Sequence, residues 1–182
     1  MRLLGTLVAI LALGAVPARA VHLDQLLAVK DGQIVVGSFD FATNQGSLRR
    51  VPYAQTFGSS PGYPYQGNPG WNAVSSGLPS GYAPLPGNSD VGFDVLVGPP
   101  IWRNLAFWNG TLPVTWETPV NAKLLIQRQT GPATYLSAVA DGGASPVNGF
   151  TIARTLASGA VHQHLDFFLL DGGNGGNPPD GV

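Results

Sequence analysis

The sequence predicts an all-β fold, built as a single antiparallel β-sandwich or jelly-roll-like domain. Short segments alternate apolar and polar residues, and turns rich in Gly and Pro separate them at intervals of roughly ten residues, as in sandwiches and jelly rolls. No segment keeps a helical period, so we expect little or no helix. Gly and Pro contribute 25 and 16 of the 182 residues, yet 44% of the chain is hydrophobic, which is too much for a disordered chain.

The first 20 residues have the pattern of a signal peptide. Arg2 provides a basic start, an apolar run covers residues 3–16, and Ala18-Arg19-Ala20 is a small-x-small cleavage pattern. The apolar run is too short for a transmembrane segment, and no later stretch is long enough. We therefore expect residues 1–20 to be removed and residues 21–182 to form one exported domain, which is periplasmic, secreted or held at the cell surface.

Composition excludes several classes of function. Residues 21–182 contain seven basic and ten acidic residues, and Arg49-Arg50 is the one adjacent basic pair. Nucleic acids and anionic membranes require clustered Lys and Arg, so neither is an expected partner. The absence of cysteine excludes thiol catalysis, cysteine zinc sites and iron–sulfur clusters. The one Gly-x-Ser-x-Gly match, residues 58–62, contains Pro61 and is typical of a turn rather than of a nucleophile elbow. The chain has no phosphate-binding loop, and we predict that it is not an enzyme. Nothing in the sequence indicates an oligomeric state.

The expected strands begin with a hairpin. Residues 21–29 and 34–41 alternate, and between them Asp31-Gly32 suits the left-handed dihedral angles of a tight turn. Residues 42–90 are the least regular part of the chain, with one edge strand expected at 49–57. The remaining strands are expected at 91–97, 112–116, 123–129, 134–140, 150–155 and 160–170.

A loop rich in Pro and Gly at residues 58–71 is also rich in aromatic side chains. The aromatic residues in and around it are Tyr53, Tyr63, Tyr65, Trp71 and Tyr82. One interpretation is a carbohydrate- or surface-binding module whose rings stack on sugars. The other is that the rings cover the core under an irregular loop, because aromatic rings bury large apolar areas. A purely structural surface protein is a further alternative.

The histidines provide the sharpest chemical hypothesis. In a strand at 160–170, His162, His164 and Asp166 share one face because side chains alternate along a strand. The third and last histidine of the chain is His22, in the tripeptide His22-Leu23-Asp24, which repeats His164-Leu165-Asp166. If the two segments pair or face each other, all three imidazoles converge.

This arrangement predicts a metal site. Its proposed ligands are His22, His162 and His164, with Asp24 or Asp166 adding a carboxylate or orienting a ring. Zinc is the first choice for imidazole with carboxylate, and copper or nickel are alternatives. A copper variant uses the free amine of Val21 together with His22. The competing interpretation is a solvated strand face without metal, since any half-buried strand carries polar residues.

Several motifs resemble an uncharacterised family of exported bacterial proteins of planctomycete type, which often carry a C-terminal PEP-CTERM sorting signal read by exosortases. The motifs are His22-Leu23-Asp24, residues 31–37, Pro69-Gly70-Trp71-Asn72-Ala73, residues 91–96, Trp108-Asn109-Gly110, residues 161–165 and Pro179-Asp180-Gly181-Val182. The resemblance implies an all-β sandwich with no assigned activity, and it supplies no ligand residues. Members of the family continue with a further strand and sometimes an anchoring tail. We therefore expect this chain to lack its last strand or strands.

Overall fold

The structure is a computed structural model that describes residues 23–40, 45–47, 57–59, 64–67, 70–99, 101–108, 112–119 and 121–171. These residues form strands, turns and loops and no helix, which confirms the all-β prediction. In the same ranges, nothing helical is long and apolar enough to cross a membrane. The expected leader at residues 1–20 and the end of the chain from residue 172 lie outside the described residues.

Twelve strands occur in the described part of the chain. In order they are β1 (Leu23–Lys30), β2 (Gln33–Asp40), β3 (Gln45–Ser47), β4 (Gly58–Ser59), β5 (Pro64–Gln66), β6 (Trp71–Ala73), β7 (Asp90–Gly92), β8 (Ala122–Gly131), β9 (Thr134–Ala140), β10 (Thr151–Arg154), β11 (Val161–Gln163) and β12 (Asp166–Asp171).

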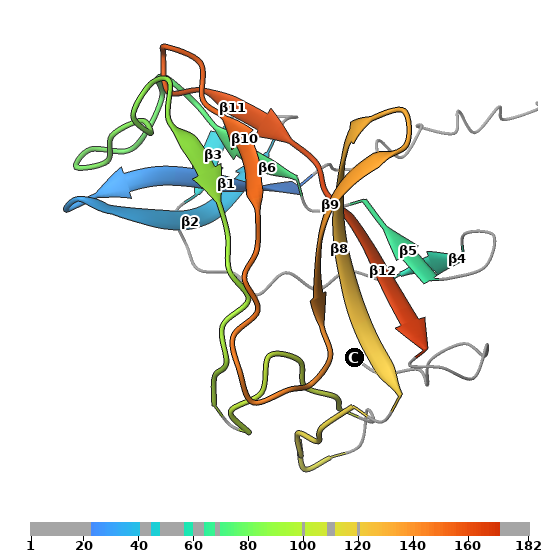
Figure 1. Ribbon diagram of the computed structural model, residues 1–182. Coiled ribbons are helices and arrows are strands. Elements are labelled where there is room, and N and C mark those ends of the chain that lie inside the picture. Colours follow the sequence, from blue (N-terminus) through green and yellow to red (C-terminus); the bar gives the residue numbers. More distant parts are fainter. Residues whose placement is uncertain are drawn as a thin grey trace, which may run out of the picture.

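The strands form two five-stranded sheets and one two-stranded ladder (Figure 1). The first sheet has the order β11-β6-β1-β2-β3, and the second has the order β4-β5-β12-β8-β9. The ladder pairs β10 with β7, and in Figure 1 β10 is drawn beside β11, β6 and β1 of the first sheet. Pairing is antiparallel except between β1 and β6, which are parallel. The prediction of a purely antiparallel domain was therefore wrong at this pair, because β6 follows a strand of the other sheet rather than a hairpin turn.

The first hairpin matches its prediction. β1 and β2 pair along their whole length, from Leu23 opposite Asp40 to Lys30 opposite Gln33. The turn residues have positive φ angles, 51° at Asp31 and 74° at Gly32. Left-handed dihedral angles at both positions are those of a type I′ turn, which matches the right-handed twist of the two strands.

Two clusters of buried side chains form the core. The first lies on the first sheet and contains Leu27, Ala73, Leu85 and Val91. The second contains Ile126, Ile152, Ala153 and Leu165 and joins β8, β10 and the chain before β12. Trp71 packs against both clusters, and its ring stacks on Phe93 and Phe167 with centroid distances of 6.4 and 6.1 Å. The ring of Trp71 therefore joins the two halves of the core, as the core-covering interpretation of the aromatic residues expects.

Several strand predictions need correction. The single strand expected at 160–170 is two strands in different sheets, β11 and β12, because Leu165 leaves the ladder and is buried in the second cluster with 1% exposure. The strand expected at 91–97 is reduced to β7, and the segment 112–116 forms no strand. Residues 112–118 are exposed, and Pro113 among them has no N–H for a ladder, so this segment contributes only the isolated bridge of Glu117 with Phe107. The edge strand expected at 49–57 lies outside the described residues apart from Phe57.

Candidate metal centre

Asp24 is the buried residue on which the site is built. It lies on β1, and its side chain is fully buried, with 0% exposure. Its Oδ1 accepts a hydrogen bond from the backbone N–H of Gly70 at 3.1 Å. Its Oδ2 accepts no hydrogen bond from the described residues. A buried carboxylate is costly unless each oxygen has a hydrogen-bond donor or a cation beside it, so Oδ2 requires a partner.

His162 lies beside that oxygen. It lies on β11, and its Nε2 is 2.9 Å from Asp24 Oδ2. The contact is short, but it is not aligned as a hydrogen bond. The His162 side chain is 51% exposed, so it forms the solvent side of the site.

His164 completes the group from the connection between β11 and β12. Its Nε2 is 3.1 Å from Nε2 of His162, and its Nδ1 is 2.9 Å from the carbonyl oxygen of Gly67. A carbonyl oxygen only accepts hydrogen bonds, so Nδ1 of His164 carries the proton. In the neutral ring this leaves a lone pair on Nε2, directed toward His162. A carbonyl that holds the second nitrogen of an imidazole in this way is the usual support of a metal-binding histidine.

Three Lewis bases therefore converge on one point. One ligand atom each from Asp24, His162 and His164 lies within 4.8 Å of the others, and the two shortest separations are 2.9 and 3.1 Å. Four ligands around zinc at bond lengths of about 2.0–2.1 Å are separated by about 3.3 Å, so only small movements are needed to enclose an ion. This group of three side chains, called the DHH cluster below, could hold a metal ion.

Gly70 makes room for the DHH cluster. A Cβ atom at this position would lie 2.8 Å from Cε1 of His164 and 2.9 Å from both Oδ1 of Asp24 and Nε2 of His164. Real Cβ contacts are not this short, so a side chain at residue 70 would displace one of the two ligands. The Gly70 carbonyl also accepts a hydrogen bond from Gln25 N at 2.8 Å, which keeps the backbone of residue 70 against β1.

Comparison with the predicted site gives a mixed result. The structure brings together Asp24, His162 and His164. His22, together with the amine of Val21, lies outside the described residues, so its predicted role as a ligand stays a prediction.

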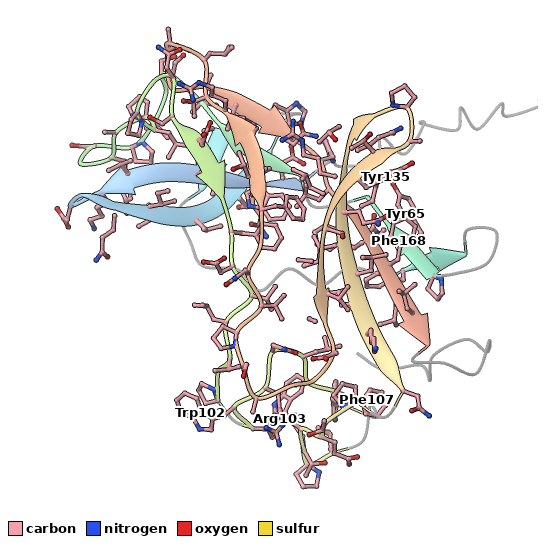
Figure 2. All side chains as sticks on the ribbon, in the orientation of Figure 1. Tyr65, Trp102, Arg103, Phe107, Tyr135 and Phe168 are labelled. Atoms are coloured by element: carbon pink, nitrogen blue, oxygen red, sulfur yellow. The ribbon has the colours of Figure 1, made fainter. Side chains whose placement is uncertain are left out.

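The proposed role of Asp166 needs correction. Its Oδ1 accepts a hydrogen bond from the hydroxyl of Tyr65 at 2.8 Å, and it is not part of the DHH cluster. The reason is the break at Leu165, which transfers Asp166 to the second sheet. Figure 2 shows Tyr65 beside Phe168, and their ring centroids are 5.2 Å apart. Burial, and then the hydrogen bond to Asp166, raise the pKa of the Tyr65 hydroxyl above its ordinary value.

The support of the DHH cluster by Gly67 and Gly70 was not predicted. A glycine beside a strand often marks a close approach of backbone to another group, and Gly70 directly before Trp71 carries that signal. The group that approaches Gly70 comes from about 90 residues later in the chain, and nothing local to residue 70 identifies it.

The described aromatic residues in and around the loop at 58–71 are each engaged in other contacts. Trp71 packs between the two core clusters, Tyr65 is engaged with Phe168 and Asp166, and Tyr82 lies under the ammonium group of Lys30 at 5.2 Å. Tyr53 and Tyr63 lie outside the described residues. Carbohydrate binding therefore gains no support from the structure.

Comparison with known proteins adds no assignment. No protein-family model, curated protein or solved structure matches the chain. The resemblance to exported bacterial proteins thus stays a prediction, and the DHH cluster is the part of the described structure that points to a function.

Proposed function

We propose that this protein is a non-enzymatic, exported metal-binding protein that holds one divalent transition-metal ion in the DHH cluster. The observation that carries the proposal is the fully buried Oδ2 of Asp24 beside two imidazole nitrogens. A bound cation would be coordinated by both imidazole rings and would give the buried carboxylate oxygen a partner. Zinc is the first choice because it accepts imidazole nitrogen and carboxylate oxygen in tetrahedral geometry, with copper and nickel as alternatives.

The proposed role of the metal is to join the two sheets. Asp24 and His162 belong to the first sheet, through β1 and β11. His164 lies in the connection that leads to β12, and its ring is held by the carbonyl of Gly67, which follows β5 of the second sheet. An ion bound to all three side chains would fix the point where the chain passes between the sheets. On this proposal, the two sheets are the halves of a jelly-roll-like domain.

The first test measures zinc content and affinity. Protein purified without a histidine tag is expected to bind one zinc ion per chain in a competition assay with a chromophoric chelator. Asp24→Asn should weaken binding at least about 100-fold, because loss of an outer-shell partner alone already costs 10–100-fold. His162→Ala and His164→Ala should have effects of the same order.

Asp94→Asn is the matched control. Asp94 is also a carboxylate that accepts one hydrogen bond from a glycine N–H, that of Gly149 at 3.0 Å, but it is exposed and is not part of the DHH cluster. Its variant should bind zinc as the parent protein does. Equal zinc affinity in Asp24→Asn and Asp94→Asn would contradict the proposed site.

The proposed location outside the cytoplasm rests on the leader pattern of residues 1–20. The protein recovered from its native host in the extracytoplasmic fraction is expected to begin at Val21 when its N-terminus is sequenced. An intact leader on that material, or recovery in the cytoplasm alone, would contradict export.

A further inference from the structure

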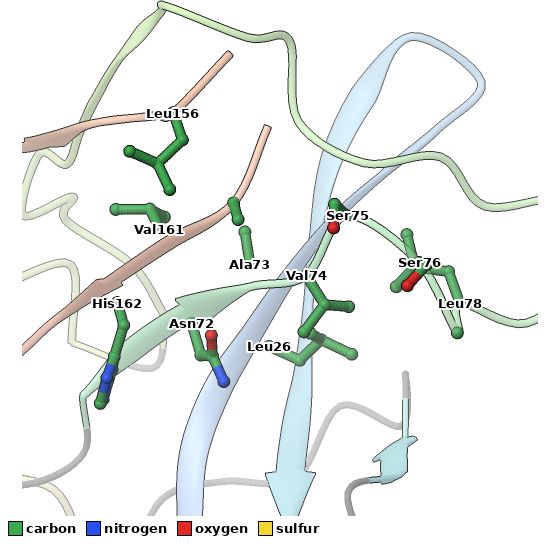
Figure 3. A pocket seen from close by; sticks show the side chains of 12 residues that line it. Leu26, Asn72, Ala73, Val74, Ser75, Ser76, Leu78, Leu156, Val161 and His162 are labelled. Carbon is green, nitrogen blue, oxygen red and sulfur yellow. The ribbon is translucent and has the colours of Figure 1, made fainter. Parts of the chain in front are cut away.

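A groove of about 490 Å³ lies beside the DHH cluster (Figure 3). His162 belongs to both, since it is a candidate ligand and also lines the groove. Leu26, Asn72 and Val74 line the groove as well, and Leu78 and Leu156 add further apolar surface. A volume of this size is in the range of pockets that hold small organic molecules.

Strand register explains why the groove and the cluster are adjacent. Leu26 on β1 is opposite Asn72 on β6, and Asn72 is opposite His162 on β11. Residues opposite each other in a sheet project from the same face, and Figure 3 shows these three in a row. Asp24 is two residues before Leu26, so it projects from that face too. The DHH cluster therefore lies at one end of the groove.

Asn72 is a mostly buried residue that lines the groove and carries a polar amide. It is 6% exposed, and no hydrogen bond of its amide is found within the described residues. An amide has one acceptor oxygen and two N–H donors. The amide atoms of Asn72 are not among the fully buried side-chain atoms without a partner, so solvent or a bound molecule can reach them. Its position in the wall of the groove, next to His162, places this amide where a bound molecule would meet it.

Charge and polarity define the ligand class. A divalent ion, one carboxylate and two neutral imidazoles have a net charge of +1, and a tetrahedral ion bound by three side chains keeps one position open. Of the described residues that line the groove, only His162 is titratable, and most of the others are apolar or small. An anionic oxygen donor would neutralise the centre, Asn72 would donate to it, and a hydrocarbon part would contact the groove wall.

We infer that the groove binds a small organic monocarboxylate, whose carboxylate takes the open position on the metal and accepts a hydrogen bond from Asn72. The inference rests on the proposed metal site and adds a ligand class to it. Hexanoate is the probe, and acetate and hexan-1-ol are its partial counterparts: acetate lacks the hydrocarbon part, and hexan-1-ol lacks the charge.

The experiment is calorimetric titration of each probe into zinc-loaded and metal-free protein. Hexanoate should bind the zinc-loaded protein roughly 30- to 250-fold more tightly than acetate, since each buried methylene contributes roughly fourfold. Hexan-1-ol should bind the zinc-loaded protein at least tenfold more weakly than hexanoate does. Hexanoate should likewise bind the metal-free protein at least tenfold more weakly than the zinc-loaded protein. Equal affinities for hexanoate and acetate, or equal binding with and without zinc, would overturn the inference.

Two variants test the groove without touching the metal ligands. Asn72→Leu should lower hexanoate affinity roughly tenfold or more at unchanged zinc content, because hydrogen bonds to charged groups contribute about 1.5–3 kcal/mol. Val74→Phe should fill the groove and abolish the preference for hexanoate over acetate. Val36→Phe is the matched control, because Val36 is opposite Leu27 and thus projects from the other face of the first sheet.

Zinc stoichiometry, measured before each titration, separates the two proposals. If zinc binds with the parent stoichiometry and the probes show no selectivity, the groove inference is wrong and the metal site stands. If zinc does not bind, the proposed function is wrong and the groove inference falls with it. If Val74→Phe unfolds, Asn72→Leu and the probe series still decide the outcome.

Discussion

At the scale of the residue, Gly70 supports the DHH cluster in three ways. Its N–H donates to Asp24, its carbonyl accepts from Gln25, and its missing side chain leaves room for the ring of His164. No other residue type can do all three, because any Cβ would collide with two candidate ligands. The glycine is required here by close packing rather than by an unusual φ angle.

Gly70→Ala is therefore expected to weaken zinc binding about 10- to 100-fold, the range found when groups that support a metal ligand are lost. The displaced group is His164 or Asp24. Chelator competition measures the affinity. Gly98→Ala is the control, since a Cβ at residue 98 meets nothing within 4 Å. Parent-like affinity in Gly70→Ala would show that the short contacts around Gly70 do not constrain the ligands.

A second residue-scale prediction concerns Tyr65. Its phenolate would lie beside the carboxylate of Asp166 in a partly buried site, so the pKa of the hydroxyl is raised above 10.0. Because the pKa is raised in the folded state, the protonated hydroxyl contributes to the stability of the fold. This contribution is present below pH 10 and is lost as the pH rises through the pKa of folded Tyr65.

Ultraviolet titration of the tyrosines should show a late component from this residue. The component should be absent in Tyr65→Phe and should move to lower pH in Asp166→Asn. Tyr135→Phe, which removes the hydroxyl of an exposed tyrosine, should leave the component in place. A titration curve of Asp166→Asn identical to that of the parent protein would remove Asp166 as a cause.

At the scale of the element, the break between β11 and β12 explains both the core and the site. Leu165 is 1% exposed and packs in the second core cluster, and His164 directly before it turns toward Asp24. The same two residues thus end one sheet, contribute a core side chain and provide a candidate ligand. Loss of the packing of Leu165 should therefore affect both the stability of the core and the position of His164.

Leu165→Ala is expected to lower the free energy of unfolding by about 2–5 kcal/mol, as for other large-to-small changes in cores. Urea denaturation measures this change. Leu96→Ala is the control, because Leu96 is 72% exposed and its loss should change stability by less than about 0.5 kcal/mol. Similar midpoints for the two variants would contradict the assignment of Leu165 to the core.

The same elements show what could be predicted from the sequence. The first hairpin was predictable because Asp31-Gly32 specifies its turn locally. The proximity of Asp24 to His162 and His164 was predictable in part, because strand alternation determines which neighbours share a face with Asp24 and with His162. The role of Asp166 was not, because both halves of 160–170 alternate and nothing in their pattern shows that the chain changes sheets at Leu165. The roles of Gly70 and Asn72 could not be predicted, because they depend on β6 lying between β1 and β11. Contacts between segments so far apart in the chain leave no local sequence pattern.

At the scale of the whole molecule, the proposed metal would act as a link between the two sheets. The chain crosses between the sheets after β5 and after β11, and the DHH cluster lies where both crossings meet. The chain has no cysteine, so no disulfide can make this link. A ligand that binds the native state and not the unfolded chain stabilises the native state by mass action.

Zinc at 100 times its dissociation constant should therefore add about 2.7 kcal/mol to the free energy of unfolding. For a chain of this size, that corresponds to a rise in Tm of about 5–10 °C, read by circular dichroism or calorimetry. Asp24→Asn should show a rise of at most about 2 °C, while Asp94→Asn should show the full rise. Unequal behaviour of these two matched variants separates binding at the DHH cluster from weak binding elsewhere.

The most direct test of the central claim is X-ray absorption spectroscopy of the zinc-loaded, untagged protein. The account predicts two imidazole nitrogens and a carboxylate oxygen at about 2.0–2.2 Å from zinc, with the outer-shell scattering that imidazole rings produce. A zinc shell of oxygen atoms without imidazole scattering would contradict it, because neither His162 nor His164 would then be a ligand.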